Sequence, residues 1–192
     1  MTLMNFLTDF ADQAVLLPIV VAVALLLAVR GQRHAALVWL TAIGATFAVV
    51  LLLKLCFMAC GPVFAGAALR TPSGHTAAAS VVAGGLTALF TARRWLVLAT
   101  ALLAAVVIGW SRLSLGLHSP LEVVVGGLLG VAGAGVLSRA LGEPAVKRPA
   151  PVLGVAVVLA ILLHGMRLPA EAAIARASHV AFDFVPACRS GP

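Results

Sequence analysis

The sequence predicts an all-α protein that crosses a membrane several times, as a bundle of six transmembrane helices. Of its 192 residues, 62% are hydrophobic and only 10% are charged, and the mean hydropathy is +1.14. A soluble domain of this size carries far more charged surface. No internal repeat, low-complexity tract or linker divides the chain, so we expect a single domain over residues 1–192.

Six apolar runs give the expected number of helices. They span Ala14–Val29, Ala35–Leu53, His75–Phe90, Trp95–Trp110, Leu121–Leu137 and Val152–Met166. Several are shorter than the ~20 residues that a spanning helix usually needs. Short runs still fit a bilayer if the helices continue into polar ends, from which Arg and Lys side chains reach the interface. Asp9 and Asp12 precede the first run, which therefore does not resemble a signal peptide.

The net charge of +7 is spread over the ends of the apolar runs rather than gathered in one patch, so we do not expect a nucleic-acid partner. Seven basic residues follow the first, third and fifth runs: Arg30, Arg33, Arg93, Arg94, Arg139, Lys147 and Arg148. The other six fall at the opposite ends: Lys54, Arg70, Arg112, Arg167, Arg176 and Arg189. Since cytoplasmic loops carry the excess of positive charge, we expect both termini and the functional site on the extracytoplasmic face of a bacterial inner membrane.

A polar stretch between Ser111 and Glu122 is the first candidate site. Ser119 is a good N-cap and Pro120 a natural first helical residue, which places Glu122 one turn after His118. A carboxylate there can fix the tautomer of the imidazole and raise the basicity of its other nitrogen. Ser119-x-x-Glu122 is also a capping box, in which the carboxylate only satisfies a backbone N–H. The residues leave both interpretations open.

The second candidate stretch lies ahead of the third apolar run. Pro72 is a plausible helix start, which puts the N–H groups of Ser73, Gly74 and His75 in an unsatisfied first turn that can bind a phosphate. Gly74 lets a ligand approach the backbone, Ser73 adds a hydroxyl donor, and His75 exchanges a proton near neutral pH. The alternative is an ordinary helix cap with a surface histidine.

Together the two stretches resemble the phosphatidic-acid phosphatase type 2 (PAP2) superfamily of membrane lipid phosphatases. Its pattern is Lys-x6-Arg-Pro, then Pro-Ser-Gly-His, then Ser-Arg-x5-His-x3-Asp. The second motif is present as Pro72-Ser73-Gly74-His75. The third is present as Ser111-Arg112, with His118 after five further residues and Glu122 after three more. The last position holds Glu instead of Asp, and the longer carboxylate can still reach an imidazole. In the first motif Lys54 and Pro62 are in place, but Gly61 stands where the family has arginine. The resemblance covers residues 54–122.

The resemblance implies a phosphatase that needs no metal ion or other cofactor. His118 attacks the phosphorus and forms a phosphohistidine, Glu122 holds its ring, and His75 protonates the departing oxygen and then activates water. The implied phosphate-binding residues are Lys54, Ser73, Gly74, Arg112 and, as the candidate substitute for the missing arginine, Arg70.

A phosphate site at the level of the lipid headgroups suits a phosphate carried on a hydrophobic tail. Such substrates include a phosphatidic acid, phosphatidylglycerol phosphate, a polyprenyl (di)phosphate and a lipid A phosphate. Two alternatives remain: a phosphotransferase with a lipid as acceptor, and a non-catalytic protein that binds or transports a lipid phosphate. The two histidines favour an enzyme, because binding alone requires neither a nucleophile nor an acid. The sequence predicts no particular oligomeric state.

Small residues at four-residue spacing, Ser80 with Gly84 and Gly126 with Gly130, predict close packing of the third and fifth runs. Since these runs begin at the two histidine motifs, such packing holds the motifs together.

The tail, residues 167–192, is expected to form a short amphipathic helix that lies in the interface or caps the site. Its apolar positions are Ile174, Ala177, Ala181 and Phe184, with Glu171, Arg176, His179 and Asp183 elsewhere around the helix. The three cysteines, Cys56, Cys60 and Cys188, show no metal-ligand spacing and fall on the expected oxidising side. Because Cys56 and Cys60 are one helical turn apart, a geometry unsuited to bridging, a disulfide from Cys188 to one of them is our hypothesis.

Overall fold

A computed structural model describes residues 2–60 and 71–181, with side chains through residue 178. The described residues form α-helices and no strand, which confirms the all-α prediction for this part of the chain. The helices are α1 (Leu3–Asp9), α2 (Gln13–Val29), α3 (Arg33–Ala59), α4 (Gly74–Phe90), α5 (Arg94–Ser114), α6 (Pro120–Leu141), α7 (Ala150–Leu163) and α8 (Ala170–Ala181).

Four helical segments among the described residues are long and apolar enough to cross a membrane. They are Leu3–Val29, which joins α1 and α2, and the helices α3, α5 and α6. The apolar helices α4 and α7 have only 17 and 14 residues. The structure therefore supports a protein that crosses the membrane several times, and the count of six spans stays a prediction.

Several helix ends differ from those expected from the apolar runs. α3 continues through Lys54 to Ala59, and α5 continues through Arg112 to Ser114, so both cations belong to helices. α7 ends at Leu163, before the expected end of the sixth run. The short helix α1 has no counterpart in the sequence prediction. Polar side chains do not end a helix when its backbone hydrogen bonds continue, which is why the apolar runs underestimated α3 and α5.

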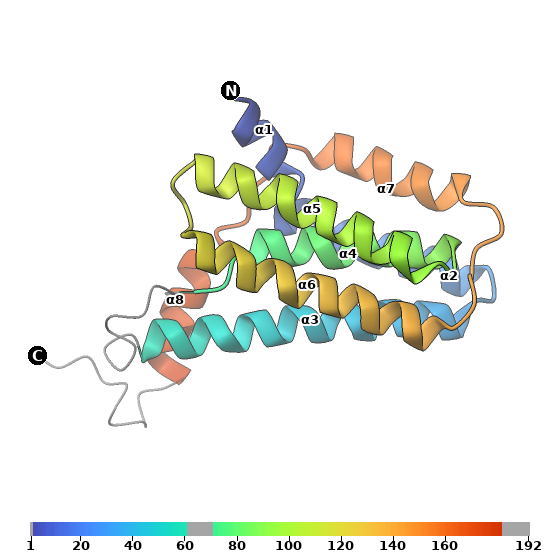
Figure 1. The fold of residues 1–192 in the computed structure, drawn as a ribbon, viewed down its shortest axis with the longest axis horizontal. Coiled ribbons are helices and arrows are strands. Elements are labelled where there is room, and N and C mark those ends of the chain that lie inside the picture. The colour runs from blue at the N-terminus through green and yellow to red at the C-terminus, as the bar shows by residue number, and fades with distance from the viewer. Residues whose placement is uncertain (1, 61–70, 182–192) are drawn as a thin grey trace, which may run out of the picture.

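The helices α2 to α7 run alternately back and forth, and this order collects the motif-bearing segments at one end of the bundle (Figure 1). That end holds the C-terminus of α3, the N-termini of α4 and α6, the α5–α6 connection and α8. The α2–α3, α4–α5 and α6–α7 connections lie at the other end. These connections and the helix ends beside them carry the seven basic residues expected on the cytoplasmic side. The side of the membrane that each end faces stays a prediction.

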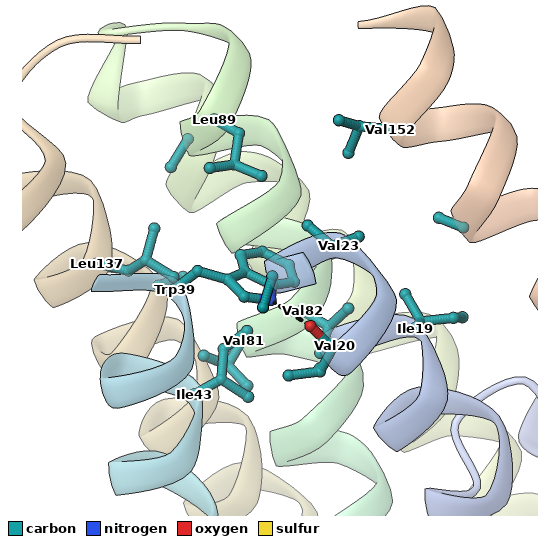
Figure 2. Packing of buried hydrophobic residues seen from close by; sticks show 14 of the residues in the cluster. Ile19, Val20, Val23, Trp39, Ile43, Val81, Val82, Leu89, Leu137 and Val152 are labelled. Carbon is teal, nitrogen blue, oxygen red and sulfur yellow. Dashed lines mark hydrogen bonds between the residues drawn. The ribbon is translucent and has the colours of Figure 1, made fainter. Parts of the chain in front are cut away.

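The apolar core is built around Trp39 of α3 (Figure 2). Its indole is fully buried, and Nε1 donates a hydrogen bond to the carbonyl of Val20 in α2 at 2.9 Å. Val81 of α4 and Leu137 of α6 belong to the same cluster. A Cβ at Gly85 would lie 3.0 Å from the indole, so the glycine makes room for it. This core fixes α2, α3, α4 and α6 relative to one another.

Close backbone contact between α4 and α6 confirms the predicted role of the small residues. A Cβ added to Gly126 would lie 2.4 Å from the carbonyl oxygen of Ser73, and one added to Gly130 would lie 2.4 Å from that of Ala77. A Cβ on Gly84 would meet a methyl group of α6 at 2.6 Å. Such distances exclude any side chain, so Gly126 and Gly130 hold the N-terminus of α4 directly against α6, and Gly84 lets the second half of α4 approach α6 as closely.

The tail helix α8 packs on α3, close to the motif-bearing end. Its packed face differs from the expected one, because Ser178 is buried while Ala177 is exposed. Glu171, one turn before Ile174, also lies on the inner face, since it pairs with a residue of α3. The expected position Phe184 lies outside the described residues.

Candidate active site

The Pro-Ser-Gly-His segment forms the N-terminus of α4, with Ser73 as the N-cap and Gly74 as the first helical residue. The prediction that Pro72 starts the helix is wrong, because the Ser73 hydroxyl accepts the N–H of Thr76 at 3.5 Å and caps the helix one residue later. This hydroxyl also lies 2.9 Å from that of Thr76 and is fully buried. The N–H groups of Gly74 and His75 fall in the first turn, where a helix offers no carbonyl partner.

The predicted pair of His118 and Glu122 is present at the start of α6. Nδ1 of His118 lies 3.0 Å from Oε2 of Glu122, and the same oxygen accepts the N–H of Ser119 at 2.9 Å. Ser119 is the N-cap and Pro120 the first helical residue, as predicted, and the capping box is complete. The carboxylate of Glu122 therefore contacts both the backbone of the capping box and the imidazole, and its catalytic role stays a prediction. With Nδ1 engaged, Nε2 is the ring nitrogen left for chemistry.

Burial lowers the pKa of His118 below its ordinary value of 6.5, and the nearby cations Arg112 and Lys54 act in the same direction. The hydrogen bond to Glu122 raises this pKa but does not reverse the shift. A lowered pKa keeps the imidazole neutral near pH 7, which is the form that a nucleophile requires.

Glu122 also joins the two histidine motifs. Its Oε1 accepts the N–H of Thr71 at 3.0 Å, and its backbone carbonyl accepts the N–H of Ser73 at 2.9 Å. The expectation that the Ser73 N–H is free for a phosphate is therefore wrong, because that group already has a partner.

Lys54 is buried within the bundle, with 2% of its surface exposed. Its ammonium group forms an ion pair with the carboxylate of Glu171 in α8. The side-chain carbon Cε lies 3.4 Å from the position that a Cβ on Gly74 would take. The missing side chain of Gly74 thus leaves room for the lysine beside the first turn of α4.

Arg112 lies in the last turn of α5 and is 8% exposed. Its Nη1 donates to the hydroxyl of Thr8 in α1 at 3.4 Å, whereas Nε is buried and has no hydrogen-bond partner among the described residues. A buried donor without a partner is costly and is available to an anionic ligand.

A pocket of about 690 Å³ opens where these elements meet. It is lined by Met58, Thr71, Arg112, Gly116, Leu117, His118, Ser119, Glu122 and Glu171. Three predicted site residues, Arg112, His118 and Glu122, thus share one cavity. Lys54 is connected to the cavity through Glu171, while Ser73, Gly74 and His75 are not among the lining residues.

His75 lies at the same end of the bundle, one residue into α4, and contacts a carboxylate that the sequence did not indicate. Its Nε2 is 3.5 Å from Oδ2 of Asp12, and its Nδ1 is buried without a hydrogen-bond partner among the described residues. Thr8 and Glu171 are further residues that motif reasoning missed. The available signal was topological, because the segments before the first run and after the sixth were both expected at the site end.

Some predicted features lie outside the described residues, namely Arg70, Gly61, Pro62 and Cys188. Cys60 is disulfide-bonded and Cys56 is a free, half-buried thiol. Within residues 2–60 and 71–181, no group of three or more His, Cys, Asp or Glu side chains is arranged to hold a metal ion. The absence of a cofactor stays a prediction.

The fold and the site define a helical membrane protein with a pocket beside His118 and Glu122, and His75 lies at the same end of the bundle. A model of the PAP2 superfamily matches residues 37–144, more than half of the chain, and the protein belongs to this superfamily. The resemblance drawn from the motifs is thereby confirmed, and membership supports a phosphatase acting on lipid phosphates. No curated protein and no solved structure matches the chain.

Proposed function

We propose that the protein is a metal-independent lipid phosphatase that works through a phosphohistidine on His118. The observation that carries this proposal is the 3.0 Å contact between Nδ1 of His118 and Glu122 at the wall of the pocket. A carboxylate on Nδ1 fixes the tautomer in which Nε2 carries the lone pair, and it stabilises the charge that the ring acquires when Nε2 bonds to phosphorus.

In the first step, Nε2 of His118 attacks the phosphorus while the bond to the lipid oxygen breaks, and His75 gives its proton to that oxygen. In the second step, water loses a proton to His75 and displaces the ring nitrogen. Arg112, Lys54 and the N–H of Gly74 hold the non-bridging oxygens, over which the charge of the transition state is spread. Loss of one such donor typically costs on the order of 100- to 1,000-fold in rate.

The lipid character of the substrate is supported by the position of the pocket at the ends of membrane-spanning helices, with Met58 and Leu117 in its wall. A phosphatidic acid, phosphatidylglycerol phosphate, a polyprenyl (di)phosphate and a lipid A phosphate all present a phosphate at the boundary between an aqueous phase and an apolar one. Transfer of the phosphoryl group to a second lipid uses the same intermediate, with a lipid hydroxyl in place of water.

We further propose six spans, with the site on the extracytoplasmic side of a bacterial inner membrane. The clustering of seven basic residues at the opposite end of the bundle supports this orientation. α4 and α7, with 17 and 14 residues, are about 26 and 21 Å long at ~1.5 Å per residue. Both are shorter than the ~30 Å hydrocarbon layer, so their flanking residues must complete the crossing. Topology reporters fused to each terminus test the orientation, and a cytoplasmic C-terminus would contradict it.

The activity is tested by phosphate release from a panel of lipid phosphates, in detergent with EDTA. We expect turnover by the wild type, none by His118→Ala, and a strong loss in His75→Ala. His34→Ala, an exposed histidine at the opposite end, is the matched control and should keep wild-type activity.

Acid-quenched reactions with labelled substrate should trap label on the wild type and none on His118→Ala. Wild-type protein that binds these lipids without releasing phosphate would instead indicate the non-catalytic alternative. Release of a phosphorylated acceptor lipid in place of phosphate would indicate the phosphotransferase.

A further inference from the structure

Asp12 is a buried carboxylate at the N-terminus of α2, and its two oxygens have different partners. Oδ1 accepts the N–H of Ala14 at 2.9 Å, which caps α2, and the N–H of Leu168 at 3.1 Å, from the connection between α7 and α8. Oδ2 lies 3.5 Å from Nε2 of His75. The carboxylate is thus fixed by backbone donors from two segments and presents its remaining oxygen to the histidine.

We infer that Asp12 is the positioning residue of His75, the proton donor of the proposed phosphatase, and this inference rests on that proposed function. Capping α2 uses only Oδ1, so a cap does not explain the placement of Oδ2. Asp12 is 5% exposed within a segment long and apolar enough to cross a membrane. An ionisable group in such a place is costly and usually has a functional partner, which here is the imidazole.

The contact assigns distinct roles to the two ring nitrogens. Nε2 holds its proton toward Oδ2, which leaves Nδ1, buried and unpaired among the described residues, as the atom that exchanges a proton with the substrate. When the phosphorus–oxygen bond to the lipid breaks, the electron pair stays on that oxygen and the Nδ1 proton moves to it. His75 becomes neutral, and the carboxylate of Asp12 stays ionised throughout.

The start of α2 lies directly beside the start of α4. The side-chain nitrogen Nε2 of Gln13 is 3.7 Å from the position that a Cβ on Gly74 would take, and Cε of Lys54, from α3, is 3.4 Å from that position. Asp12 therefore approaches His75 from a segment that the superfamily match over residues 37–144 does not include. No family motif assigns it a role.

The test compares two substrates that differ in their need for a proton donor. A lipid alkyl phosphate releases a basic alkoxide that must be protonated, whereas a nitrophenyl phosphate ester of the same charge releases an acidic phenol that leaves without help. Asp12→Asn is the informative variant, because Asn caps a helix as well as Asp but replaces the charged carboxylate by a neutral amide, whose NH2 group cannot accept the Nε2 proton of His75. Asp9→Asn is the matched control, since this neighbouring buried carboxylate pairs with Arg167.

We expect Asp12→Asn to lose on the order of 10- to 100-fold in kcat/KM on the alkyl phosphate and to stay close to wild type in kcat/KM on the aryl phosphate. This parameter reports phosphoryl transfer to His118, the step in which the leaving groups differ, and not the hydrolysis of the phosphohistidine, which both substrates share. His75→Ala should show the same preference for the aryl ester, and adding Asp12→Asn to it should cost nothing more. Asp9→Asn should keep the wild-type kcat/KM on both esters.

Equal losses on both substrates, or no loss on either, would overturn the role of Asp12 while leaving the phosphatase intact. A wild-type protein that hydrolyses neither ester would instead overturn the proposed function itself. The melting temperature in detergent identifies a variant that has merely lost its fold. If Asp12→Asn is such a variant, Asp12→Glu is combined with His75→Ala instead. A further loss of activity in that double variant would show that Asp12 does not act through His75.

Discussion

The backbone N–H of Ser73 donates a hydrogen bond to the backbone carbonyl of Glu122 at 2.9 Å. This bond joins the capping residue of α4 to the carboxylate-bearing turn of α6, two segments separated by 49 positions in the chain (122 minus 73). The contact is possible only because Gly126, one turn further along α6, has no side chain. The relative position of the two histidine motifs therefore depends on main-chain contacts as well as on side chains.

Substitution of Gly126 by alanine should damage both stability and activity. The new Cβ would lie 2.4 Å from the Ser73 carbonyl oxygen, and backbone atoms cannot rotate away, so α4 and α6 must separate. Overpacking of this kind costs about 1–3 kcal/mol. The melting temperature and the phosphatase rate in detergent measure the two effects. Gly154→Ala on α7, where nothing lies within 4 Å of the added atom, is the control, and a Gly126→Ala protein that matches it would contradict the model of the contact.

The pH dependence of kcat/KM should reflect the lowered pKa of His118. Burial favours the neutral ring and lowers the pKa of His118 below 6.5. The acidic limb of the kcat/KM profile should therefore have its midpoint below pH 6.5. Glu122→Gln removes the group that raises this pKa, so the limb should move to still lower pH.

The plateau rate of Glu122→Gln should drop on the order of 10- to 100-fold as the ring loses its orientation. Glu143→Gln, an exposed glutamate at the opposite end of the bundle, should leave the profile unchanged. A limb that moves upward in Glu122→Gln would show that Glu122 does not favour the protonated ring.

Replacement of Glu171 by glutamine should strengthen phosphate binding. Its carboxylate pairs with Lys54 and lines the pocket, so it competes with an anionic substrate for the same ammonium group. Because the side chain of Glu171 is 49% exposed, we expect a modest gain, of about 0.2–1 kcal/mol or up to roughly fivefold in the inhibition constant of inorganic phosphate. Weaker inhibition in Glu171→Gln would show that the carboxylate assists binding instead.

Arg70→Ala should lose at least ~10-fold in activity if Arg70 supplies the cation that Gly61 does not. Arg176→Ala, an exposed arginine on α8, should keep the wild-type rate. Comparison of the two variants under identical detergent conditions gives the answer. Equal rates for both variants would show that Arg70 does not replace the arginine missing at position 61.

Local chemistry was predictable from the sequence where donor and acceptor lie within a few residues of each other. Ser119, Pro120 and Glu122 specify a capping box and a histidine partner because one helical turn fixes their spacing. The close packing of α4 on α6 was predictable for a similar reason, since small residues four apart lie on one face of a helix.

Contacts between distant segments were not predictable in this way. No periodicity relates Asp12 to His75 or Thr8 to Arg112, because these pairs depend on how α1 and α2 pack beside α4 and α5. The sequence did not indicate that the Ser73 N–H already has a partner, because this partner is a carbonyl on another helix. In α8, the predicted apolar face was displaced because the pairing of Glu171 with a buried lysine decides which side faces α3.

Thr8, Asp12 and Glu171 all lie outside residues 37–144, the segment that defines the superfamily match, yet they contact Arg112, His75 and Lys54 within it. A chimera that transplants only the matched segment into another scaffold would inherit the nucleophile while leaving those three groups with new neighbours. Proteins with identical motifs can therefore diverge in rate or substrate preference through flanking helices that a motif search never inspects.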